Sequence, residues 1–190
     1  MCIRDRYKSG KGENFQQVAD ALVNIRQASG LAGDELKAAT NAAMLLNDTF
    51  GMETAETTRA ATALMKNFGI TAEEAYGIIA VGAQNGANKN GDLLDTLNEY
   101  SVHYKALGLD ADQFITSLIK GAEAGSFSID KIGDAVKEFT IRSKDGSKTS
   151  AEGFAAIGLN AETMTAAFAA GGDAAEAAFF QTVKALNAME

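Results

Sequence analysis

The sequence predicts an all-α protein, a compact array of about eight to ten short helices joined by glycine-capped corners, with no sheet. Three observations support this class. Apolar residues recur at spacings of three and four along most of the 190 residues, no segment shows the alternation of a strand, and proline is absent. A recurring corner motif marks where one helix ends and the next begins.

The corner motif places a glycine between two apolar residues and follows it with a polar residue. It occurs four times, at Phe50–Glu56, Phe68–Glu74, Leu107–Asp112 and Ile157–Glu162. The glycine can take the left-handed conformation that closes a helix, and the polar residue can cap the next helix. The second and third copies also have capping-box spacing, Thr71 with Glu74 and Asp110 with Gln113. The intervals between copies are unequal, which indicates a reused corner between unlike helices and no repeat of fixed period.

Four helices are expected before residue 85, each with one apolar stripe. The first two should span 13–28 and 34–50, and the next two should begin at about Thr54 and after Thr71. Their buried stripes should be Phe15, Val18, Leu22 and Ile25; Leu36, Ala39, Ala43, Leu46 and Phe50; Ala61, Leu64, Met65 and Phe68; and Ala75, Ile78 and Ile79.

Residues 84–92 interrupt this pattern with two Asn-Gly pairs and are expected to form an exposed loop. Three more helices should follow: one capped by Asp92, one that ends between Gly121 and Gly125, and one capped by Ser128. Their buried stripes should be Leu93, Leu97, Tyr100 and Tyr104; Phe114, Ile115, Leu118, Ile119 and Ala122; and Ile129, Ile132, Val136 and Phe139.

The polar stretch 143–150 is the best candidate for a boundary or mobile loop. It separates a predicted helical core domain, 13–142, from an Ala-rich and acidic helical segment, 151–190. Short helices are expected there around Phe154, around Met164 and Phe168, and over Phe179, Val183 and Leu186. Because this segment ends without a helix stop signal, we expect it to be truncated.

Residues 1–12 are expected to be disordered. Met1–Arg6 has neither a helical nor a strand period and lacks the apolar core of a signal peptide. These six residues resemble translated adaptor sequence at the start of metagenome-assembled reading frames. We therefore expect them, Cys2 included, to be non-native, and the chain to be a fragment of a longer protein.

The balance of charge disfavours several classes of partner. The formal net charge is −8 and the isoelectric point is about 4.7, which does not favour nucleic acid or an anionic membrane surface. A single cysteine cannot form an intrachain disulfide or a multi-cysteine zinc site. The densest apolar run, Ile78–Val81, is far shorter than the roughly 20 residues of a membrane span.

We find no motif for catalysis, a cofactor or a metal. The single histidine, His103, has Glu99 at helical spacing but no nucleophile or second imidazole, so a surface or interface role is the expected one. With Gly91 as the sixth position of a calcium loop, Gly86 and Leu97 would stand where Asp and Glu are needed. Ser9–Gly12 lacks the glycine run and the Ser or Thr of a phosphate loop.

Two further patterns have a structural explanation. Glu73 with Glu74 and Asp110 with Asp112 lie at predicted helix starts, where acidic groups complement the helix dipole. The stretch Asn98–Tyr100 with Tyr104 could line a groove for a partner helix, although half-buried packing is the commoner reason for such a stripe.

The order of segments resembles the helical core region of phage tail tape measure proteins of siphophages and prophages. The stretches that carry the resemblance are Leu46–Gly51, Asp92–Tyr100, Lys105–Leu109, Gly121–Phe127 and Asp134–Phe139. Together they extend over roughly 15–142. Members of this family are far longer and often carry hydrophobic segments or a cell-wall hydrolase domain, features that the sequence does not contain.

The resemblance implies a non-enzymatic structural role in the lumen of the phage tail. In that family, the chain sets tail length, scaffolds assembly of the tail tube in the host cytoplasm and leaves the tube when DNA is ejected. The implied partners are other copies of the chain, the tail-tube protein and tail assembly chaperones, with no cofactor. The alternatives are a generic helical protein-binding module and, third, a carboxylate-only glycosidase using Glu99.

Overall fold

The computed structural model describes residues 15–189, and within this range it contains ten helices and no strand. The predicted all-α class and the number of helices are therefore confirmed. The predictions for residues 1–12 lie outside the described residues. The helices are α2 (Phe15–Ser29), α3 (Gly33–Phe50), α4 (Thr54–Phe68), α5 (Ala72–Gln84), α6 (Leu93–Ala106), α7 (Ala111–Glu123), α8 (Asp130–Arg142), α9 (Lys148–Ala156), α10 (Ala161–Ala170) and α11 (Gly172–Asn187).

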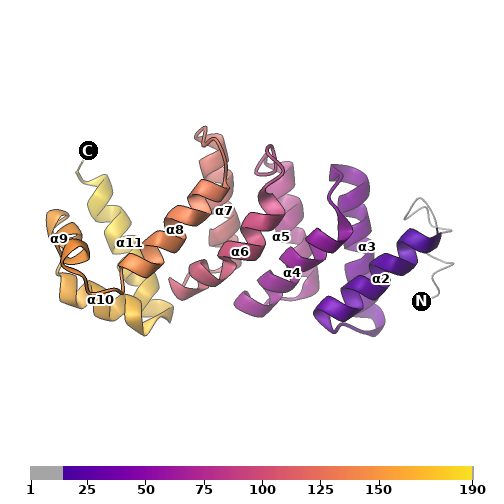
Figure 1. Ribbon diagram of the computed structural model, residues 1–190, viewed down its shortest axis with the longest axis horizontal. Helices are drawn as coiled ribbons and strands as arrows, with labels where there is room; N and C mark the ends of the chain where they lie inside the picture. Colours follow the sequence, from indigo (N-terminus) through magenta and orange to yellow (C-terminus); the bar gives the residue numbers. More distant parts are fainter. Residues whose placement is uncertain (1–14, 190) are drawn as a thin grey trace.

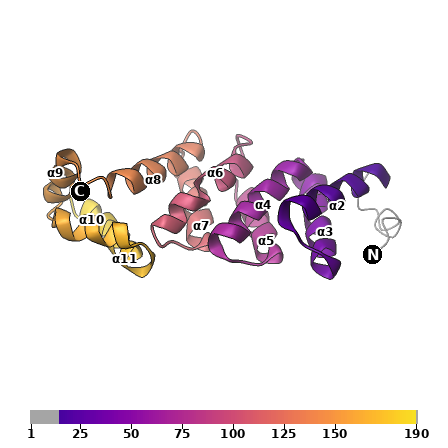
Figure 2. The same ribbon diagram turned by 60° about the horizontal axis from the view of Figure 1, so that its bottom comes forward.

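The helices from α2 to α8 zigzag between two layers (Figure 1). The first layer contains α2, α4, α6 and α8, each packed against the next, and the second contains α3, α5 and α7, packed in the same way. Each helix from α2 to α6 therefore contacts the helix that follows it in the sequence and also the one after that. The result is a row of stacked helices, longer than it is wide, and α9–α11 gather at its C-terminal end (Figure 2).

The corners between the layers have the predicted chemistry. Gly51 and Gly69 adopt φ values of +68° and +71°, and their amides donate to the carbonyls of Asn47 and Met65, so each closes a helix. Met52, which follows the first glycine, folds back and is buried. Because glycine has no Cβ, it alone takes this left-handed conformation without steric cost.

The polar residues after these glycines cap the next helices. Both predicted capping boxes form: the Thr71 hydroxyl accepts from the amide of Glu74 at 3.2 Å, and Asp110 Oδ1 accepts from the amide of Gln113 at 2.7 Å. Asn160 caps α10 in the same way. Local sequence therefore determines where these helices begin.

Three predicted caps or boundaries need correction. Asp92 precedes α6 but its side chain makes no capping hydrogen bond, because its carboxylate accepts instead from the Ser128 hydroxyl in the next loop. The predicted loop 143–150 is shorter than expected, since α9 begins at Lys148 and Ser147 caps it by accepting from the amide of Ser150. The predicted cap Ser128 is also wrong: the N-cap residue of α8 is Ile129, without a side-chain cap, and the Ser128 hydroxyl accepts from the amide of Asp130 just before the helix.

One core runs between the layers and continues into the C-terminal helices. Its centre includes fully buried Leu64, Ile79, Leu97 and Phe114, and the same cluster reaches Phe168 of α10. Phe139 of α8 packs edge-on against Phe168, with ring centroids 5.3 Å apart, and against Phe179 of α11 at 5.9 Å. Val18 belongs to a smaller cluster with Ala21 and Met44.

Candidate interaction surface

The single histidine lies near an ion pair between α6 and α8. His103 is partly exposed on α6. Glu99, one turn away on the same helix, pairs with Lys137 of α8, and the distance from Nζ to Oε1 is 3.0 Å. Burial lowers the pKa of His103, and the positive charge of Lys137 lowers it further. Both effects favour the neutral form of the imidazole, whereas the charge of Glu99 acts in the opposite direction.

The tyrosine stripe of α6 is packed within the chain. Tyr100 is 4% exposed, and its ring lies against Gly133 of α8, where a methyl group would clash with it. Its hydroxyl donates to Asp130 at 3.0 Å, and burial raises its pKa. Tyr104 is 1% exposed, and its hydroxyl makes a 2.8 Å hydrogen bond with Ser117. Within the same chain, α8 therefore covers Tyr100 and α7 covers Tyr104.

The acidic residues at helix starts act largely as caps. Glu74 accepts from both the amide and the hydroxyl of Thr71, and these hydrogen bonds lower its pKa. Asp110 is engaged in its own capping box. Each is thereby held by the first turn of a helix.

The residues described, 15–189, bring together no group of three or more His, Cys, Asp or Glu side chains that could hold a metal ion. Within the same range, no helix combines the length and the apolar character required to cross a membrane. The sequence Ser9–Gly12, judged unlike a phosphate loop, lies outside the described residues.

The comparisons with known proteins point to a phage tail. Residues 8–190 match the family model described as "Phage-related minor tail protein". The chain belongs to this family. It is also 33% identical over 156 residues to the "Probable tape measure protein" of Streptomyces phage phiC31. That alignment covers 82% of this minor tail protein chain but only 21% of the phage protein, so the chain spans about a fifth of its relative's length.

No solved structure matches this minor tail protein chain. The family assignment, together with the helical model, supports a structural role in the tail and agrees with the resemblance drawn from the order of the helical segments. It also suggests a non-enzymatic role. The tail is therefore the location that these relationships support.

Two hollows lie along the second layer in the part of the chain that the structure describes. One hollow of about 510 Å³ runs between α3 and α5, and a second of about 340 Å³ runs between α5 and α7. Gly77 of α5 lines both of them. Sequence reasoning missed Gly77, although a glycine inside a helical period is a usable signal.

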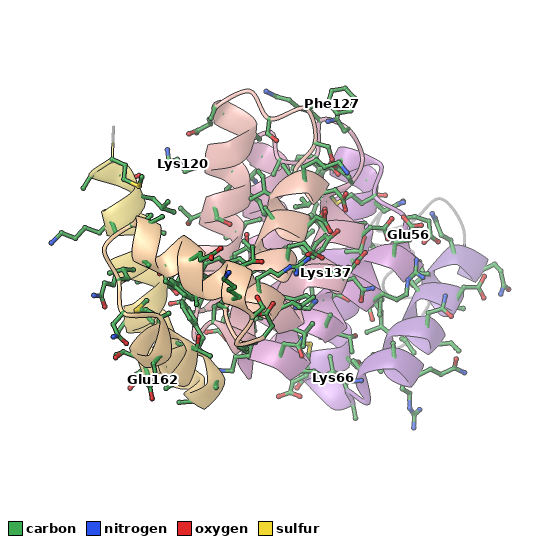
Figure 3. The ribbon with its side chains drawn as sticks, turned by 60° about the vertical axis from the view of Figure 1, so that its left-hand side comes forward. Glu56, Lys66, Lys120, Phe127, Lys137 and Glu162 are labelled. Carbon is green, nitrogen blue, oxygen red and sulfur yellow. The ribbon has the colours of Figure 1, made fainter. Side chains whose placement is uncertain are left out.

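A separate exposed feature lies along one edge of the row, where α7 ends and α8 begins (Figure 1). Phe127, 91% exposed, sits at the tip of the loop between α7 and α8 and points away from the helices (Figure 3). Its carbonyl accepts from the side-chain amide of Asn90 in the preceding loop, and the Ser126 hydroxyl donates to the carbonyl of Ser128. The loop is thus held in place while the aromatic ring stays in solvent.

Proposed function

We propose that this chain is a section of a tape measure protein, the component that sets the length of a phage tail and scaffolds assembly of the tail tube. The similarity to the phiC31 protein over 82% of the chain is the observation that carries the proposal. In this role the chain occupies the tail lumen, leaves it during DNA ejection, and contacts copies of itself, the tail-tube protein and assembly chaperones in the host cytoplasm.

The fold makes the ruler function depend on conformational state. A continuous helix advances about 1.5 Å per residue, so the 15 residues of α4 and the 13 of α5 would contribute roughly 40 Å to an extended ruler. In the stack the same pair advances the row by only one spacing between packed helices, about 8–10 Å. Folded and extended states of this section therefore measure very different lengths.

A deletion within the complete phage gene tests both the role and the state. Removal of Thr54–Gln84 takes out one helix from each layer, α4 and α5. Electron microscopy of the particles should show tails shorter by about 45 Å if the section is extended in the tail, and by about 10 Å if it stays stacked. A duplication of the same segment should lengthen the tail by the same amount. Tails of unchanged length would contradict the proposal.

The division of the chain is also a proposal. We infer that 13–142 is the tape-measure-like core and that 151–190 is a helical segment that follows it after the 143–150 stretch. Small-angle X-ray scattering on the isolated chain should give the dimensions of a folded array. A scattering curve of an extended coil, with no folded population, would contradict a folded domain.

A further inference from the structure

One glycine on the outer face of α5 has no packing role in the chain. In the helices α2–α8, a side chain at interior Gly82, Gly121 or Gly133 would clash with Ile115, Ile132 or Tyr100, respectively, which explains each of those glycines. Gly77 differs, because a Cβ built there meets no atom within 4 Å. A glycine inside a helix costs about 1 kcal/mol relative to alanine. No contact within the described chain therefore explains why this position is a glycine, which lowers helix stability.

The surroundings of Gly77 have the form of a seat for a helix. The two hollows that meet at this residue follow the lines between parallel helices of the second layer. The floor of the larger hollow consists of small side chains, Ala38 and Ala42 of α3 and Ala80 of α5. Leu45 and Val81 stand on the rims, 51% and 44% exposed. A helix laid here could bring its backbone close to α5 at Gly77.

The charges of the second layer identify the chemistry of the occupant. Within the described helices, the first layer carries equal numbers of acidic and basic residues, whereas acids far outnumber bases in the second. The second-layer acids are Asp34, Glu35, Asp48, Glu73, Glu74, Asp112 and Glu123, against Lys37 and Lys120.

The charged residues that line the two hollows are all acidic: Glu73, Glu74, Asp110 and Asp112. Capping accounts for Glu74 and Asp110, but Glu73 and Asp112 take no part in the capping hydrogen bonds and are exposed. All four lie at the end of the hollows where α5 and α7 begin. Basic residues on a partner would meet complementary charge there.

These observations also favour a different protein over a second copy of this chain. The first layer is balanced in charge and offers no net attraction to an acidic face, and two chains of net charge −8 repel one another. Nucleic acid is disfavoured by the same sign of charge.

We propose that the outer face of α3, α5 and α7 binds a cationic amphipathic helix of a partner protein, with a small or apolar residue over Gly77 and Lys or Arg beside Glu73 and Asp112. Basic residues are stabilising in the last turn of a helix, so we place them there, which orients this helix antiparallel to α5. The proposal goes beyond the role in tail length and does not rest on it, since an acidic docking face could serve a chain of any tail function.

Site-specific photocrosslinking in the full-length phage protein tests the proposal during infection. The photoreactive residue benzoylphenylalanine replaces Leu45 on the rim of the groove. A matched control carries it at Val102 of α6, which is 52% exposed on the first layer. Mass spectrometry of the cross-linked peptides should identify, from the Leu45 position only, a helical segment with Lys or Arg in its last turn from a different protein.

Two variants decide whether the cross-link reports this groove. The double variant Glu73→Lys/Asp112→Lys should reduce its yield at least tenfold, and Gly77→Leu should do the same by filling the seat. Circular dichroism of both should match the parent chain. Gly77→Leu should melt slightly higher, because leucine favours a helix over glycine, and the double lysine variant slightly lower, because positive charge opposes the helix dipole at the starts of α5 and α7. The proposal is overturned by a cross-link no stronger than at Val102, by one to a second copy or to a segment without basic residues, or by one that survives charge reversal.

Discussion

The hydroxyl of Ser128 donates a 2.6 Å hydrogen bond to Oδ2 of Asp92, joining two loops that lie 36 residues apart in the sequence. The bond ties the start of α6 to the loop before α8 along one edge of the row, and Asn90 adds a second tie through the carbonyl of Phe127. The other carboxylate oxygen, Oδ1, is buried and has no partner. Asp92 therefore links two loops and does not cap α6.

We expect Ser128→Ala to lower the free energy of unfolding by about 1–2 kcal/mol, because it removes a hydrogen bond to a charged group. Urea unfolding followed by circular dichroism gives this value. In a double-mutant cycle, Asp92→Ala with Ser128→Ala should cost less than the sum of the single variants. Strict additivity would show that the two side chains do not interact.

The two helical glycines Gly77 and Gly133 should respond in opposite directions to alanine. Gly77→Ala should raise the free energy of unfolding by about 1 kcal/mol, since its surroundings are open and alanine favours a helix. Gly133→Ala should lower it by about 1–3 kcal/mol, because the new methyl group must displace the Tyr100 ring. Thermal unfolding of the pair measures both, and equal shifts would contradict the packing described here.

The corner at Gly69 should be sensitive to a side chain for a different reason. Gly69→Ala meets no neighbouring atom, but it forces a non-glycine residue to a φ of +71°. The expected loss is about 1–2 kcal/mol of the free energy of unfolding. Gly153→Ala on α9, where the surroundings are equally open and φ is not positive, serves as the control and should be neutral or stabilising.

His103 should make the stability of the chain depend on pH in one direction. Its pKa is lowered in the folded state, so between that value and its unfolded value, near 6.5, the unfolded chain binds more protons. The stabilisation is present above pH 6.5 and is lost as the pH falls through this window. His103→Gln should therefore lose less stability than the parent between pH 7.5 and 5.5, as measured by urea midpoints. A steeper loss in the variant would contradict the direction of the shift.

Truncation after Arg142 should destabilise the remaining helices. It removes Phe168 and Phe179 from the Phe139 ring, and it also removes Gly172, whose carbonyl lies so close to Gly108 that a side chain there would clash. The truncated chain should melt at a lower temperature and bind more of an apolar dye such as ANS. An unchanged melting temperature would support the predicted boundary at 143–150 as one between independent domains.

The helices were predictable because their signals are local. The apolar stripes, the glycines at the corners and the caps at Thr71 and Asp110 act within four or five residues, and the structure confirms them. The reading of the Tyr100 and Tyr104 stripe as packing is also confirmed, but its partner helix could not be named. The motif before α6 gave the wrong role for Asp92 because a hydroxyl 36 residues away competes for its carboxylate.

The sequence by itself determined that this chain is a set of short, capped helices without a recognisable catalytic or metal site, and the order of those helices pointed to its family. Only the tertiary structure decided that alternate helices stack into two layers, that α8 fills the groove at Tyr100, and that Gly77 lies where two hollows meet. The physical reason is the distance along the chain over which each kind of interaction acts. Helix period and capping depend on neighbours along the chain, whereas layer pairing depends on contacts between side chains far apart in sequence.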